Sequence, residues 1–249
     1  MPEVVIHRYA DTHYSFQDGF AAQKIMEGVY DQAHFERCAL QPNHCVKPQT
    51  YSNKQHNQLF VFYAGKGYIT TPRRAFNITE PTIFVPEFDR ESFEIRCSAD
   101  SDAPLEYLHI VTELSDYDKT CLVESRMSLP RFRPLSQGWT YVEDFKREDT
   151  TSLMLLEHRN LGRLSMGAVL GTGPAVIGQH IHNELTQWYF MLPGSHMAYT
   201  AGNQTYEMQS GDLSFTPRGY SHGSTAQAGQ KYDYIWFELC DDGYPGEIK

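Results

Sequence analysis

The chain has 249 residues, which is enough for one or two domains with a sizeable core. Its net charge of −10 (histidine neutral) disfavours a nucleic-acid partner, because the phosphate backbone attracts basic surfaces. No segment approaches the ~20 apolar residues of a membrane span, and no basic region followed by an apolar stretch opens the chain. The five cysteines form no CxxC pair. We therefore expect reduced thiols in a cytoplasmic protein that contacts neither nucleic acid nor membrane.

Short apolar runs separated by glycine and proline recur along the first half of the chain. The runs LFVFY (59–63), IFVP (83–86) and YLHIV (107–111) are rich in aromatic and β-branched residues, which is typical of strands. Long helical periodicity is scarce. These patterns predict a β-sandwich or β-barrel domain over residues 1–115.

A change in composition follows this domain. Residues 116–138 contain Pro130, Pro134 and Gly138, and we expect them to form a linker. The segment DYDKTCLVESRMSLP (116–130) is its best helical candidate, although the pattern is weak. The apolar runs resume after the linker, so a second β domain is expected over residues 139–249.

The most informative residues of the chain lie in this second domain. The segment 178–194 contains a His-x-His pair and a glutamine, and the segment 211–222 contains Pro-x-Gly followed by a further histidine. Side chains at positions i and i+2 of a strand project from the same face, so His180 and His182 point together. The Pro-x-Gly bend would carry His222 back toward this pair.

Three imidazoles and one side-chain amide at these spacings can close around a single metal ion. Imidazole suits Zn, Cu, Fe and Ni, and a neutral oxygen ligand extends the choice toward Mn. We therefore predict one divalent transition metal per chain (Fe, Mn, Zn or Ni), with positions left open for substrate or water. The predicted metal ligands are His180, His182, Gln187 and His222.

The two segments resemble the two signature motifs of the cupin superfamily. The resemblance extends over residues 173–226 and departs from the family pattern at three positions. Gln187 stands where the family has Glu, the opening glycine is displaced by one position to Gly173, and Ala226 replaces the final Asn. The resemblance implies a double-stranded β-helix (jelly-roll) barrel, with metal ligands at the four positions named above. It also implies a homodimer formed through sheet edges.

The two halves of the chain repeat each other. Residues 58–67 align with 187–196, and residues 80–91 align with 211–222. We therefore expect an all-β protein of two tandem cupin barrels, a bicupin, in which the first barrel has lost its metal site. At the four ligand positions, the first half has Tyr51, Asn53, Gln58 and Glu91.

The glutamine at the ligand position affects the expected chemistry. Glutamine cannot titrate, so three neutral histidines and Gln187 would leave the ion its full double charge. That charge favours an anionic ligand and Lewis-acid chemistry. Proton transfer must then come from nearby side chains. Strand alternation and the turn around His222 supply the candidates, for which core packing or a solvated surface is the alternative. The catalytic candidates are Tyr189, Tyr199 and Glu184, and the substrate-binding candidates are Arg218, Tyr220, Trp236 and Met166.

Three functions follow from this site. The first is a metal-dependent isomerase or lyase acting on a small anionic organic molecule, such as a sugar acid or keto acid. The ligand set is similar to that of cupins that open or isomerise unsaturated uronates. The second is an Fe(II)-dependent dioxygenase, since three histidines also suit iron. The third is a cupin that binds a small ligand without catalysis.

Overall fold

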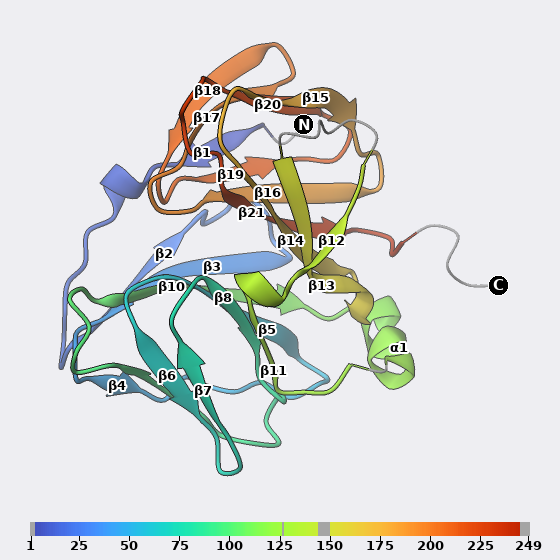
Figure 1. Ribbon diagram of the computed structural model, residues 1–249. Helices are drawn as coiled ribbons and strands as arrows, with labels where there is room; N and C mark the ends of the chain where they lie inside the picture. Colours follow the sequence, from blue (N-terminus) through green and yellow to red (C-terminus); the bar gives the residue numbers. More distant parts are fainter. Residues whose placement is uncertain (1–2, 126, 144–149, 245–249) are drawn as a thin grey trace. The chain divides into compact units, whose positions relative to one another are not determined.

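The computed structural model describes residues 3–125, 127–143 and 150–244. Within these residues, nearly all regular structure is antiparallel β-sheet (Figure 1). The α-helix α1 (Asp116–Glu124) falls inside the segment expected to be helical. None of the helices in the described part of the chain could cross a bilayer. The predicted all-β fold is confirmed.

The chain divides into two compact units. The first-repeat unit contains residues 12–119 and 126–137, and the second-repeat unit contains residues 1–11, 120–125 and 138–249. Each unit is built from one larger sheet and one four-stranded sheet.

The first-repeat unit has a six-stranded sheet. Its strands are β2 (Phe20–Ile25), β3 (Ala33–Leu40), β5 (His56–Ala64), β8 (Thr82–Val85), β10 (Leu105–Glu113) and β11 (Arg131–Pro134). They follow the order β11-β8-β5-β10-β3-β2. The smaller sheet has the order β4-β9-β6-β7, with bounds Cys45–Val46, Glu94–Cys97, Gly67–Thr70 and Ala75–Ile78. Its core combines aromatic side chains of the larger sheet, such as Phe60 and Phe84, with Ile69 and Ile95 of the smaller sheet.

The second-repeat unit has a seven-stranded sheet. Its strands are β1 (Val5–His7), β12 (Trp139–Tyr141), β13 (Thr150–Leu161), β14 (Leu164–Gly171), β16 (Leu185–Met191), β19 (Leu213–Thr216) and β21 (Tyr234–Cys240). They follow the order β1-β19-β16-β21-β14-β13-β12. The smaller sheet has the order β15-β20-β17-β18, with bounds Ala175–Ile181, Ser221–Ala226, His196–Ala201 and Gln204–Gln209. Buried Tyr189, Tyr199 and Met197 belong to its core.

The alternation of side chains explains why these segments form two-layered sheets. In β17 every second residue is buried, as expected for a strand with one face on the core and one in solvent. The central strands β5 and β16 are buried along almost their whole length, which matches their continuous apolar runs.

The two larger sheets share one strand order. In each of them, however, one edge strand comes from outside the repeat that forms the rest of the sheet. The order β8-β5-β10-β3-β2 in one unit corresponds to β19-β16-β21-β14-β13 in the other. Strand β1 precedes the first repeat but pairs with β19 of the second-repeat unit. Strand β11 lies in the segment expected to be a linker but pairs with β8 of the first-repeat unit. A boundary at residue 115 therefore does not separate the two units.

Asp212 anchors the N-terminal segment. Its carboxylate is buried and accepts hydrogen bonds from the backbone N–H of Tyr9 at 2.9 Å and of Gln209 at 3.1 Å. Arg8 Nη1 donates to the same carboxylate at 2.8 Å. The preceding Gly211 has φ +80°, and a Cβ there would lie 2.6 Å from the Tyr9 ring, so only glycine fits the close approach.

Candidate metal centre

Three histidines of the second-repeat unit converge at one end of its smaller sheet. His180 lies on β15 and His182 directly follows that strand, while His222 lies on β20. His180 and His222 are register partners across these neighbouring strands. One ring nitrogen from each histidine lies within 4.8 Å of the other two. This spacing allows all three nitrogens to reach a single metal ion.

Backbone hydrogen bonds define which nitrogen each ring presents. His180 Nδ1 lies 2.8 Å from the carbonyl oxygen of Gly178, and His222 Nδ1 lies 3.0 Å from that of Tyr220. A carbonyl only accepts, so Nδ1 carries the proton in both rings and Nε2 keeps its lone pair. Such a backbone partner on the second nitrogen is typical of metal-ligating histidines.

The environment of His222 fits a bound cation. Its Nε2 is buried and has no hydrogen-bond partner. Burial lowers the pKa of His222 to about 3, so the ring is neutral at physiological pH. A buried acceptor without a partner is costly, and a divalent ion would satisfy it. The three histidines therefore fit the metal that their spacing predicts.

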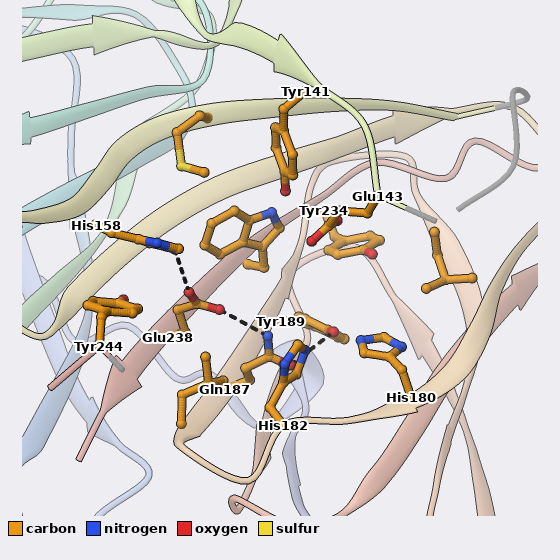
Figure 2. A pocket seen from close by; sticks show the side chains of 14 residues that line it. Tyr141, Glu143, His158, His180, His182, Gln187, Tyr189, Tyr234, Glu238 and Tyr244 are labelled. Atoms are coloured by element: carbon orange, nitrogen blue, oxygen red, sulfur yellow. Dashed lines mark hydrogen bonds and ion pairs between the residues drawn. The ribbon is translucent and has the colours of Figure 1, made fainter. Parts of the chain in front are cut away.

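Gln187 lies on β16 near His180 and His182, with its side chain buried (Figure 2). Its Oε1 accepts a hydrogen bond from the Tyr189 hydroxyl at 3.2 Å. Its Nε2 donates to Glu238 Oε2 at 3.1 Å. An amide oxygen has two lone pairs, so Oε1 keeps one for a metal.

Glu238 on β21 is a buried carboxylate that the sequence did not indicate. Its Oε1 accepts a hydrogen bond from Ser165 Oγ at 2.6 Å, and His158 Nε2 lies 3.3 Å from the same oxygen. Burial raises the pKa of Glu238. Hydrogen bonds from His158, Ser165 and Gln187 have the larger, opposite effect, so the pKa of Glu238 lies below its ordinary value. The site thus holds an ionised carboxylate. Strand alternation could have suggested Glu238, since it lies two residues after Trp236.

A cavity of about 450 Å³ within the second-repeat unit is lined by His180, His182, Gln187 and Glu238, among other residues. Its walls combine aromatic and aliphatic side chains with the polar groups described above. None of the described residues that line it is Lys or Arg. The lining residues are Tyr141, Glu143, Met154, His158, Ile177, His180, His182, Leu185, Gln187, Tyr189, Tyr234, Trp236, Glu238 and Tyr244.

Three predicted residues near the turn do not line this cavity. Arg218 is half exposed and pairs with Asp241 at 3.5 Å and Asp242 at 3.3 Å. Tyr220 contributes its backbone carbonyl to His222. Glu184 is exposed. Arg218 therefore pairs with carboxylates at the surface. Glu184 faces solvent, which is the solvated surface position given above as the alternative to a catalytic role.

The remaining candidates divide between core and cavity. Met166 and Tyr199 are fully buried and do not line the cavity; the Tyr199 hydroxyl pairs with Thr216. Tyr189 and Trp236 do line it. The structure thus places two of the seven non-ligand candidates in the cavity wall and the other five elsewhere.

The corresponding positions of the first-repeat unit are occupied differently. Gln58 Nε2 donates to the Gln49 carbonyl at 2.8 Å and lies 3.0 Å from His109 Nε2. Glu91 pairs with Arg73. Among the described residues, the only metal-type cluster of His, Cys, Asp or Glu is that of His180, His182 and His222. A second cavity of about 370 Å³ includes Tyr51 and other residues of this unit in its lining.

No family model and no curated protein match the chain. Solved structures do match it. An oxalate decarboxylase–formate complex from Lactobacillus farciminis is 12% identical, with a TM-score of 0.69, covering 95% of this chain and 88% of that one. A glyoxylate-induced protein from Pseudomonas aeruginosa is 10% identical (TM-score 0.77, 99% and 92%), and protein Ylba from E. coli is 13% identical (TM-score 0.72, 99% and 94%). These are cupin-type structures, and at such identities the likeness establishes the fold.

Proposed function

We propose that this protein is a metal-dependent enzyme of the lyase or isomerase type that acts on a small, oxygen-rich anion such as a keto acid or sugar acid. The observation that carries the proposal is the convergence of three imidazoles beside a cavity of about 450 Å³. His180 and His182 line this cavity, and His222 has a buried Nε2 without a hydrogen-bond partner. A divalent ion bound there would supply Lewis-acid polarisation of a substrate oxygen. Several structural neighbours are named oxalate decarboxylases, which is consistent with a lyase.

The charges of the cavity narrow the substrate class. Glu143 and Glu238 line it, and no described lining residue is Lys or Arg. A substrate with two carboxylates would place one of them near these acidic groups without a compensating cation. We therefore propose a substrate with a single carboxylate, bound at the histidine cluster.

Several side chains of the cavity have roles in this proposal. Burial raises the pKa of the Tyr189 and Tyr234 hydroxyls well above the ordinary value, so both remain protonated hydrogen-bond donors. Trp236 contributes an apolar wall that excludes water from the substrate. His158 is partly exposed and contacts Glu238, so its Nε2 can hold a proton between solvent and the cavity.

The test begins with metal analysis of protein purified without a histidine tag. We expect one divalent ion per chain, lost in His182→Ala and kept in Glu207→Gln, which changes an exposed side chain of the same unit. Two ions per chain would contradict the loss of the first site. Metal retained at full stoichiometry in His182→Ala would contradict the centre itself.

Activity is then screened anaerobically with monocarboxylic keto acids and sugar acids. Anaerobic turnover that requires His182 supports the lyase or isomerase. Oxygen consumption by the iron-loaded protein under reducing conditions, with no anaerobic turnover, would instead support the dioxygenase. Ligand binding that depends on His182 without turnover in either condition would support a binding protein.

A further inference from the structure

Gln187 stands at the position where the cupin motif that this chain resembles has a glutamate. A different glutamate, Glu238, lies directly opposite it on the neighbouring strand. Gln187 on β16 and Glu238 on β21 are register partners in the antiparallel pair. Their side chains lie on the cavity side of the sheet and are joined by a hydrogen bond of 3.1 Å (Figure 2). The negative charge that the ligand position lacks is thus present one side chain away.

Glu238 also determines which way the Gln187 amide points. A carboxylate only accepts hydrogen bonds, so the amide must turn its Nε2 toward Glu238. Its Oε1 is then directed away from Glu238 and toward the Tyr189 hydroxyl, at 3.2 Å. An amide turned the other way would set oxygen against carboxylate oxygen and would offer N–H, which cannot ligate a cation, in place of the oxygen.

Glu238 is itself held in place by a second set of contacts. Its Oε1 accepts a hydrogen bond from Ser165 Oγ at 2.6 Å, and Ser165 Oγ in turn accepts from the Tyr244 hydroxyl at 2.8 Å. The His158 ring, which pairs with Glu238, stacks on the Tyr244 ring with centroids 4.2 Å apart. The carboxylate is therefore fixed before any metal binds.

From these contacts we infer that Gln187 and Glu238 form a divided ligand. The Gln187 oxygen takes the metal-ligand position, while Glu238 supplies the negative charge and fixes the amide orientation from behind. Glu238 is a positioning residue that acts through Gln187. The four neutral ligands alone would leave the double positive charge of the metal ion uncompensated. The buried Glu238 carboxylate, one hydrogen bond from the ligand Gln187, offsets part of that charge.

The test exchanges the two side chains. Three variants are made: Glu238→Gln, Gln187→Glu, and the double variant carrying both. Binding of Co²⁺ to the metal-free protein is titrated by visible absorption, and the Tm of each metal-free protein is measured. Both readouts are independent of catalytic activity, so they do not require the substrate to be known.

We expect Glu238→Gln to weaken Co²⁺ binding about 10- to 100-fold, the usual effect of losing a partner of a metal ligand. The two amides can pair in either orientation, so Gln187 no longer presents its oxygen consistently. We expect Gln187→Glu to lower the Tm of the metal-free protein, because it places two buried carboxylates opposite each other. The double variant keeps both the hydrogen bond and the net charge, and should restore Tm and bring Co²⁺ affinity to that of the natural protein or above it.

Two outcomes would overturn the inference. One is a Glu238→Gln variant that binds Co²⁺ as tightly as the natural protein. The other is a folded double variant that binds Co²⁺ no more tightly than Glu238→Gln does. If Glu238→Gln does not fold, the corresponding outcome is a folded double variant that binds Co²⁺ at least about 10-fold more weakly than the natural protein. Non-additivity between the two positions is the signature of a direct coupling.

The inference rests on the metal centre of the proposed function, and His182→Ala separates the two failures. Unchanged Co²⁺ binding in His182→Ala would contradict the centre and the inference together. Loss of binding in His182→Ala with no change in Glu238→Gln would contradict the divided ligand alone. Glu207→Gln, which removes an exposed carboxylate of the same unit, serves as the matched control and should change neither readout.

Discussion

Replacing Asp212 with alanine should loosen the N-terminal segment from the second-repeat unit. The Asp212 carboxylate is fully buried and joins two stretches of chain that are far apart in sequence. It accepts from the backbone N–H of Tyr9 and of Gln209, and from Arg8. Alanine removes all three hydrogen bonds. Strand β1 keeps its pairing with β19, and the segment keeps the packing of Val4 and Ile6 on the core and the hydrogen bond from Arg8 to the Glu207 carbonyl.

The expected loss follows from these contacts. The two N–H groups are partly buried, so the loss of the acceptor costs about 1–2 kcal/mol for each, in the lower part of the range for buried groups. The Arg8 side chain is 37% exposed, so its ion pair contributes less than about 1 kcal/mol. We expect the free energy of unfolding of this unit to fall by about 2–4 kcal/mol.

The chain offers a direct assay of this unit. All three tryptophans, Trp139, Trp188 and Trp236, lie in the second-repeat unit. Their fluorescence during urea unfolding therefore reports on that unit, while circular dichroism reports on both. Asp242→Ala is the matched control, since it removes the same side chain from a position that is 90% exposed.

One result would refute the reasoning. If the tryptophan transition of Asp212→Ala coincides with that of Asp242→Ala, the carboxylate does not anchor the segment. A second check uses removal of residues 1–8 in the Asp212→Ala background. Because Tyr9 and Arg8 would already be released, the two changes together should cost less than the sum of each alone.

Three further predictions concern the candidate metal centre and its surroundings. Metal-free protein should lose about 2 kcal/mol of stability between about pH 7 and pH 5, because the folded state holds the pKa of His222 near 3 whereas the unfolded chain takes up a proton below about 6.5; urea titrations should show this loss largely abolished in His222→Gln. Gly167→Ala should destabilise the fold by about 1–3 kcal/mol and shift the fluorescence of Trp236, since its Cβ would lie 2.3 Å from that ring; an unchanged emission spectrum would contradict this. Arg218→Ala should leave the substrate KM within about twofold of that of the natural protein, because Arg218 pairs with surface carboxylates. A rise in KM of about tenfold would instead show that Arg218 binds the substrate.

The sequence predicted the histidine cluster because the relevant signals are local. His180 and His182 are two residues apart on one strand, and the Pro-x-Gly bend before His222 is readable from composition. The strand content of both halves follows from equally local runs. The helix within 116–130 was indicated only weakly but lies where it was expected.

What the sequence did not indicate depends on pairing across the sheet. Glu238 lies beside Gln187 only because β16 pairs with β21, and Ser165 reaches Glu238 only because β14 pairs with β21. Likewise, nothing local shows that Arg218 is held by two aspartates at the surface. Contacts between distant segments therefore explain why the sequence did not indicate Glu238 and why Arg218 lies outside the cavity wall.

The edge strands β1 and β11 limit which deletions this protein could tolerate during evolution. A deletion that removed the first half of the gene would also remove β1 and leave the edge of β19 open to pairing with another chain. A deletion beginning at the linker would in the same way strip β11 from β8. Removing either repeat would therefore expose an unpaired sheet edge on the other, so we expect the two repeats to be kept together whether or not both bind a ligand.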